Sequence, residues 1–294
     1  MLQLGKRTLQ TIWTAWEQFW FEADAAVPIR LFRRSLGALL FIFYSIRTLD
    51  LGLFYGESGV MPVEVLRTVI DMDGRFSVLF WLNSPASLWA LHGLFLLSLA
   101  ALALGVRTRF APWITFLLHV SFMNRNLVVS YGIDQISTFF LFALCFSTPK
   151  GSSIFDSVAL RLIQIQVCII YAYSGVEKLR GPSWWEGDAV WLALANPQVA
   201  RTDFSALAQY PGWIALLSWS SVLWEVYFPA IVWFRRLRLP ALAFGVMMHL
   251  GIGLTLRIPF FALLLIVSYV VFLSPRELRS ANNALRQRFF RKYI

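Results

Sequence analysis

Apolar residues recur along the chain in eight long runs that are separated by more polar segments. The runs cover about residues 29–48, 86–105, 110–129, 134–148, 155–178, 213–233, 239–256 and 258–273. A transmembrane helix needs about 20 predominantly apolar residues, and most of these runs approach that length. The pattern therefore predicts an all-α integral membrane protein, built as a bundle of about eight transmembrane helices.

The segment before the first run has a different pattern. Large apolar side chains recur there at helical spacing, while polar residues take the opposite face. The apolar positions are Leu9, Ile12, Trp13, Trp16, Phe19 and Trp20. This spacing is typical of an amphipathic helix lying in the plane of the membrane surface. A helix packed on a partner subunit is the alternative. We therefore assign residues 1–28 to an interfacial helix, 29–275 to a polytopic membrane domain and 276–294 to a basic tail.

Composition supports a membrane environment. Of the 294 residues, 58% are hydrophobic and only 14% are charged, whereas soluble domains average about 25% charged residues. A soluble secreted enzyme, a collagen and a disordered chain are therefore excluded. Both cysteines, Cys145 and Cys168, fall within apolar runs, so we expect small core residues and no disulfide.

The net charge of +10 comes from cations that flank the apolar runs. We therefore expect contact with membrane lipid and not with nucleic acid. Placing both termini in the cytoplasm puts 18 of the 26 Lys and Arg residues on the cytoplasmic side and 8 on the outer side. Because cytoplasmic loops are enriched in Lys and Arg, this bias predicts a multi-pass protein of the cell (inner) membrane with both termini cytoplasmic. The tail is expected to rest on anionic lipid.

Lys178 is the most informative ionisable residue. It ends the fifth apolar run and is the only one of the four lysines on the predicted outer side. Tyr171, Gly175 and Gln164 lie on the same helical face. One interpretation is a general base in an outer-facing pocket, since lysine can lose its proton where arginine cannot. In that interpretation Gly175 leaves space for a ligand. The alternative is an interface anchor, or an ion pair with Glu177 or Glu186.

Other polar residues interrupt the apolar runs. His249 lies between Gly245 and Gly253 on one face of the seventh run, and Glu225 lies within the sixth. Charged groups in the membrane are costly and mark functional positions by default, so we expect both residues to face the bundle. Each is a candidate for a ligand contact or for an interhelical bond.

Arg125 and Asp134 flank the turn between the third and fourth runs. They are expected to pair with each other, or to bind a polar head group. No spacing of His, Cys, Asp and Glu predicts a metal site. No internal repeat or matched pair of broken helices favours a transporter, which we rank third.

Several ordered stretches together resemble the horizontally transferred transmembrane (HTTM) domain family, which includes the membrane part of vitamin K-dependent gamma-carboxylase. The stretches are Arg33 with Gly37, residues 55–62 (YGESGVMP), 124–126 (NRN), 131–134 (YGID), 171–179 (YAYSGVEKL), 184–187 (WWEG), Glu225 with Phe228 and Pro229, and His249. The block from Tyr171 to Lys178, followed by Trp and Gly, is the most specific of them.

The resemblance carries expectations about chemistry. In the carboxylase, the matching lysine deprotonates vitamin K hydroquinone, which implies Lys178 as a catalytic base, His249 as the family's intramembrane histidine and a quinone, hydroquinone or lipid as cofactor. This sequence departs from the carboxylase pattern at two points. No histidine lies near Asn126, and the sequence shows no counterpart of the carboxylase's lumenal substrate domain. Whether the chain is an enzyme therefore stays open.

Two hypotheses follow. The first is a membrane enzyme that uses Lys178 as base, with His249, and binds a ligand through some of Tyr171, Gly175, Gln164, Glu225, Arg125 and Asp134. The second is a non-catalytic maturation or assembly subunit that binds a secreted peptide or a partner protein. This second hypothesis follows from the family resemblance, because the small bacterial relatives include a subunit required to mature a secreted peptide toxin.

Overall fold

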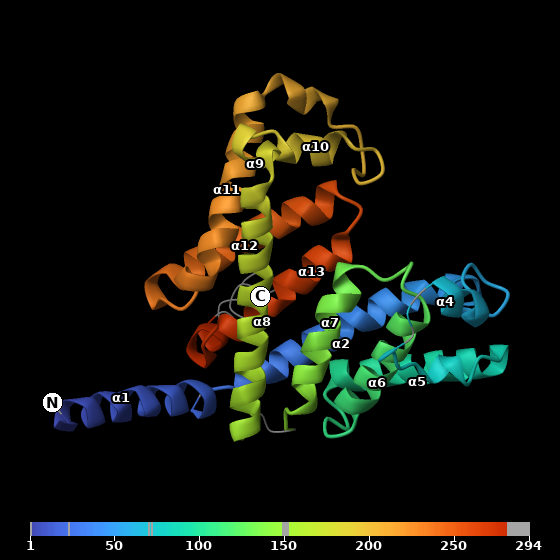
Figure 1. Cartoon of the computed structure of the whole chain (residues 1–294), viewed down its shortest axis with the longest axis horizontal. Helices are drawn as coiled ribbons and strands as arrows, with labels where there is room; N and C mark the ends of the chain where they lie inside the picture. Colours follow the sequence, from blue (N-terminus) through green and yellow to red (C-terminus); the bar gives the residue numbers. More distant parts are fainter. Residues whose placement is uncertain (1, 23, 70, 72, 149–152, 281–294) are drawn as a thin grey trace, which may run out of the picture. The chain divides into compact units, whose positions relative to one another are not determined.

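The computed structural model describes residues 2–22, 24–69, 71, 73–148 and 153–280, with side chains from residue 10 onward. The described elements are α-helices and short 3₁₀ helices, and the only β pairing among these residues is an isolated bridge between Ala200 and Leu256. The chain divides into two compact units, one of residues 1–163 with 273–294 and one of residues 164–272. Figure 1 shows the helices of each unit.

Unit 1 contains five longer helices joined by short helical segments. They are α1 (Leu2–Phe21), α2 (Ala26–Arg47), η1 (Thr48–Asp50), α3 (Leu51–Tyr55), α4 (Val63–Val69), η2 (Val78–Phe80), α5 (Pro85–Leu104), α6 (Ala111–Arg125) and α7 (Gly132–Cys145). Helices α2 and α5 pack closely at Gly37, where an added Cβ would lie 2.6 Å from the backbone nitrogen of Ala103. Only glycine permits this approach.

The amphipathic character of α1 is visible in its exposed side chains. Ile12, Trp13 and Trp16 are all exposed, by 54–62%. A row of uncovered apolar side chains on one helix is what an interfacial helix presents to lipid. The amphipathic helix is thus present, and its position at the membrane surface stays a prediction.

Helix α8 (Ile154–Arg180) begins in unit 1 and supplies the first helix of unit 2. The other elements of unit 2 are α9 (Pro182–Glu186), α10 (Ala189–Ala195), η3 (Ser205–Gln209), α11 (Pro211–Ile231), α12 (Arg235–Thr255), α13 (Pro259–Ser268) and η4 (Tyr269–Phe272). Two glycines permit close contacts: Gly175 of α8 meets the backbone of α11 at Val226, and Gly245 of α12 meets the side chains of Trp224 and Tyr269. These contacts place the polar residues of α8, α11 and α12 in one interior.

The all-α membrane class is confirmed. Each of the eight predicted apolar runs is helical, and five helices are long and apolar enough to cross a membrane: residues 26–55, α5, α8, α11 and α12. The other three are short, with 15 residues in α6, 14 in α7 and 14 in α13 with η4. At 1.5 Å per residue they reach only about 22 Å, against a hydrocarbon core of about 30 Å. Within the described residues, the bundle thus combines five helices of full spanning length with three shorter apolar helices.

The two cysteines and the basic tail were also the subject of predictions. Cys145 and Cys168 are free, buried thiols, which confirms their assignment as core residues. Residues 281–294, most of the predicted basic tail, lie outside the described residues. The cytoplasmic placement of the termini stays a prediction.

Candidate functional site

An ion pair joins the end of α8 to the middle of α11. The Lys178 Nζ atom lies 2.5 Å from Glu225 Oε1 and 3.2 Å from the hydroxyl of Ser221, one turn earlier on α11. The Lys178 side chain is 19% exposed and that of Glu225 only 6%. Removing two such charges from water is costly, and the pair is tolerated because each charge has the other as partner.

An indole ring completes the surroundings of the ammonium group. Lys178 Nζ lies 4.6 Å from the ring centre of Trp184, within the range of a cation–π interaction. The alternative of an ion pair with Glu177 or Glu186 is wrong, because the partner comes from α11. Glu177 instead accepts a 2.6 Å hydrogen bond from Arg180 at the exposed end of α8.

A cavity of about 420 Å³ opens beside this pair. Its wall is formed by Lys178, Trp184, Trp185, Trp219, Val222 and Leu223, together with Leu179. Two of the indoles are fixed by their N–H groups, since Trp185 donates to the Leu179 carbonyl at 2.7 Å and Trp219 to the Trp185 carbonyl at 3.1 Å. The cavity is therefore a preformed apolar and aromatic space with one ammonium group at its wall.

A second polar cluster lies inside unit 2. The Tyr171 hydroxyl is 2.8 Å from His249 Nε2 and 2.5 Å from the hydroxyl of Tyr269. Tyr171 is 1% exposed and His249 3%, so the expectation that His249 and Glu225 face the interior is confirmed. Tyr269 was missed because a single tyrosine within an apolar run carries no distinctive spacing.

Of the two clusters, only that of Lys178 lines the cavity. Tyr171 and His249 do not contribute to the wall of the cavity beside Lys178. The space expected beside Gly175 is filled, because an added Cβ would lie 2.9 Å from both the backbone nitrogen and Cγ2 of Val226. The sequence predicted one pocket lined by Lys178, Tyr171 and Gly175. The structure instead has a cavity at Lys178 and a packed hydroxyl–imidazole cluster at Tyr171.

Glu225 Oε2, His249 Nδ1 and Asp188 Oδ1 are among the buried atoms of unit 2 that have no hydrogen-bond partner within the described part of the chain. Buried polar atoms are normally satisfied, so each is available to a small polar group such as water. Gln164 is engaged differently: its amide donates a 2.7 Å bond to the Val271 carbonyl and fixes η4. Its expected ligand contact is replaced by a structural one.

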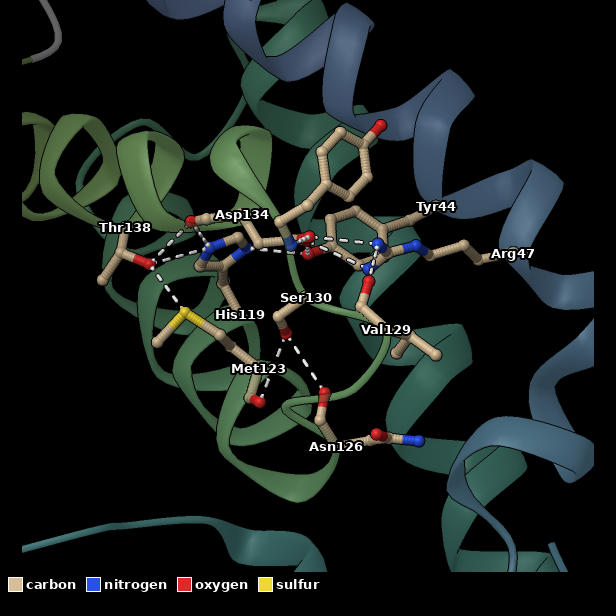
Figure 2. A network of polar contacts seen from close by, with 10 residues as sticks. Tyr44, Arg47, His119, Met123, Asn126, Val129, Ser130, Asp134 and Thr138 are labelled. Carbon is tan, nitrogen blue, oxygen red and sulfur yellow. Dashed lines mark hydrogen bonds and ion pairs between the residues drawn. The ribbon is translucent and has the colours of Figure 1, made fainter. Parts of the chain in front are cut away.

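Asp134 lies at the centre of a network in unit 1 (Figure 2). It accepts hydrogen bonds from the Tyr44 hydroxyl at 2.7 Å and from two nitrogens of Arg47 at 3.0 Å each, and it caps α7 through the Tyr131 backbone N–H at 3.1 Å. His119 Nε2 lies 2.9 Å from the Asp134 carbonyl oxygen. The carboxylate is saturated and ties α2 to the start of α7, which is a structural role.

The expected pair of Arg125 with Asp134 is therefore wrong. Arg125 turns to the segment after α3, where it donates to the carbonyls of Met61 at 2.6 Å and Gly56 at 3.3 Å and lies 3.6 Å from Glu57. Asp134 is occupied instead by Arg47 of α2. No contact that this structure gives to Arg125 or Asp134 points to a head group.

Tyr131 lies in the turn before α7, outside the helices. Burial raises the pKa of its phenol to about 12, so the side chain is neutral at physiological pH. Among the described residues, no three His, Cys, Asp or Glu side chains are grouped so that they could hold a metal ion.

Comparison with known proteins identifies part of the chain. The model of the HTTM domain family matches residues 150–276, which confirms the predicted resemblance over the region containing Lys178, Glu225 and His249. The sporulation-delaying protein SdpB of Bacillus subtilis (strain 168) is 25% identical over 121 residues, which are 40% of this chain and 38% of that protein. The match thus spans well under half of the relative. No solved structure matches the chain.

Proposed function

We propose, on the premise that residues 150–276 form an HTTM domain in a multi-pass membrane protein, that this chain acts in the maturation of a secreted peptide. In this proposal the cavity beside Lys178 holds an apolar part of that peptide. The observation that carries the proposal is the preformed, tryptophan-lined space next to a neutralised ion pair. The similarity to the sporulation-delaying protein SdpB supports it, as does the resemblance to small bacterial relatives that include a subunit required to mature a secreted peptide toxin.

The engagement of Lys178 favours binding over catalysis. A base needs an amine that has lost a proton, whereas the Lys178 nitrogen has Glu225 and Ser221 as hydrogen-bond acceptors at 2.5 and 3.2 Å. An ammonium group suits these acceptors, and the indole face of Trp184 also favours a cation. A positive group held at an apolar cavity orients a peptide by its carbonyl oxygens without further chemistry.

A second candidate is base chemistry on a quinone-type cofactor. It is favoured by one observation, the buried Glu225 Oε2 atom, which has no partner among the described residues and is able to receive a proton. The cavity volume of about 420 Å³ and its aromatic wall fit a bicyclic ring. A bound hydroquinone would supply an ionisable hydroxyl group. The residues of this chain would then hold the ring between indoles and pass one proton from Lys178 to Glu225.

Photo-crosslinking at the cavity distinguishes the two candidates. A photoreactive amino acid replacing Leu223, which lines the cavity, is expected to capture a peptide in intact cells. The matched control replaces Leu237, which is exposed at the start of α12 and does not line this cavity, and it should not capture that peptide. A quinone adduct at position 223, with no peptide, would favour the second candidate and contradict the first.

A further inference from the structure

A second cavity of unit 2 lies between the segment after α10 and the turn that joins α12 to α13. Its volume is about 530 Å³, and its wall includes Trp191, Pro197, Arg201, Asp203 and Arg257. Neither the family match nor the proposed peptide cavity assigns a role to these residues. Two arginines on the wall of one cavity indicate an anion-binding site, because guanidinium groups bind carboxylate and phosphate in bidentate geometry.

The two arginines are held by a reciprocal arrangement. The backbone N–H of Arg201 donates to Thr255 and that of Arg257 donates to Val199, each at 2.9 Å, on either side of the Ala200–Leu256 bridge. Each arginine side chain then reaches across to the opposite segment of the bridge. Arg201 Nε donates to the Leu256 carbonyl and Arg257 Nε to the Ala200 carbonyl, again at 2.9 Å.

This arrangement fixes both guanidinium groups through Nε and leaves their outer nitrogens available. Within the described part of the chain, no hydrogen bond or ion pair engages the terminal nitrogens of Arg201 or Arg257. Arg180, at the end of α8, differs because its terminal nitrogen is engaged by Glu177 at 2.6 Å. A side chain that is already immobilised loses less conformational entropy when it binds a ligand.

The net charge of the cavity wall favours an anion with a single negative charge. Arg201 and Arg257 contribute two positive charges and Asp203 one negative charge, and Asp203 is oriented by the backbone N–H and hydroxyl of Ser205. One net positive charge matches the single negative charge of a phosphodiester. The same wall contains Trp191, Leu194 and Pro197, which suit an apolar ligand portion.

Unit 2 also carries exposed aromatic side chains of the kind found at a membrane interface. Trp185, Tyr210 and Trp213, in α9 and at the start of α11, are 56–64% exposed. Tryptophan and tyrosine concentrate at the level of lipid head groups. We propose that Arg201 and Arg257 form a binding site for the phosphodiester of a phospholipid head group, which would anchor the turn between α12 and α13 to the bilayer surface.

Titration of the purified full-length protein in detergent tests this site. The probe is dihexanoyl phosphatidylglycerol, a short-chain phosphodiester lipid, with sodium phosphate and sodium acetate measured in parallel. We expect saturable lipid binding that weakens at least tenfold in the double variant Arg201→Gln/Arg257→Gln. The matched control Arg180→Gln removes an exposed cation at the end of α8 and should leave the affinity unchanged.

The other outcomes are also decisive. Equal weakening by Arg180→Gln would show nonspecific attraction to surface charge and overturn the site. Phosphate binding as tightly as the lipid, with the same loss in the double variant, would keep the phosphate site and overturn the lipid assignment. Acetate binding alone would overturn both.

A measurement on the unaltered protein covers the case in which the double variant fails to fold. Hydrogen exchange of residues 196–205 should slow at least severalfold when dihexanoyl phosphatidylglycerol is added. Unchanged exchange at saturating lipid would contradict the proposal without any variant.

Discussion

The ammonium nitrogen of Lys178 lies 2.5 Å from a carboxylate oxygen of Glu225, joining two helices that are 47 residues apart at this point. The pair forms because Gly175 lets α8 approach the backbone of α11 next to Glu225. A lysine that appeared in the sequence as an isolated end-of-helix cation is thereby part of the interior of unit 2.

Removing one member of the pair should be worse than removing both. Lys178→Met or Glu225→Gln alone leaves a buried group without its partner, and such changes cost about 3–5 kcal/mol. The double variant Lys178→Met/Glu225→Gln should regain most of that stability. Thermal unfolding in detergent measures the effect. Additive losses in the double variant would mean that the two residues do not stabilise each other.

Gly175 should tolerate no side chain. In Gly175→Ala the added methyl group would lie 2.9 Å from Val226, and overpacking of this kind costs about 1–3 kcal/mol. Gly251→Ala is the matched control in unit 2, because nothing lies within 4 Å of its Cβ position. The control should be neutral or slightly stabilising, since alanine is the better helix former. Equal unfolding temperatures for both variants would contradict the close contact of α8 with α11.

Asp134 should be coupled energetically to Arg47 and not to Arg125. The Asp134 carboxylate makes two 3.0 Å contacts with Arg47, whereas Arg125 contacts Gly56, Glu57 and Met61. A double-mutant cycle with Asp134→Asn and Arg47→Gln should give a coupling of about 0.5–3 kcal/mol. The same cycle with Arg125→Gln should stay within about 0.5 kcal/mol. A larger coupling to Arg125 would restore the pairing expected from the sequence.

The orientation in the membrane is testable by cysteine labelling. A cysteine replacing Ser183 in α9 should react with an impermeant thiol reagent in intact cells, because the cation bias places this loop outside. Arg236→Cys, in the first turn of α12, should react only after the membrane is opened. The native thiols Cys145 and Cys168 are buried and give little background. Reversed labelling of the two sites would reverse the topology.

Hydrophobic periodicity was sufficient to predict the helices but not their lengths in every case. The runs at 86–105 and 155–178 match α5 and α8 closely, whereas α6 ends at Arg125 and not at residue 129. There the chain turns so that Asn126 can donate to the Phe54 carbonyl at 2.5 Å and accept from the Val128 backbone. Such tertiary hydrogen bonds end a helix within an apolar run, and they leave no mark in the sequence pattern.

The partners of charged residues were the least predictable feature. Glu225 was expected to face the bundle, and Asp134 was expected to pair with Arg125 or bind a head group. Their partners, Lys178 and Arg47, instead come from helices distant in sequence. Spacing within one helix defines the face on which a side chain lies. It does not define which helix packs on that face. The Tyr171–His249–Tyr269 cluster required the same tertiary information.

The central claim is that Lys178 orients an apolar ligand as a charged, paired group and does not act as a base. Lys178→Arg tests it most directly, because arginine keeps the positive charge and the ion pair with Glu225 but cannot give up its proton. The account predicts that capture of the peptide at position 223 and release of the mature peptide stay within about twofold of the unaltered protein. Complete loss of mature peptide in Lys178→Arg, with normal protein level and unfolding temperature, would contradict it and establish the lysine as a base.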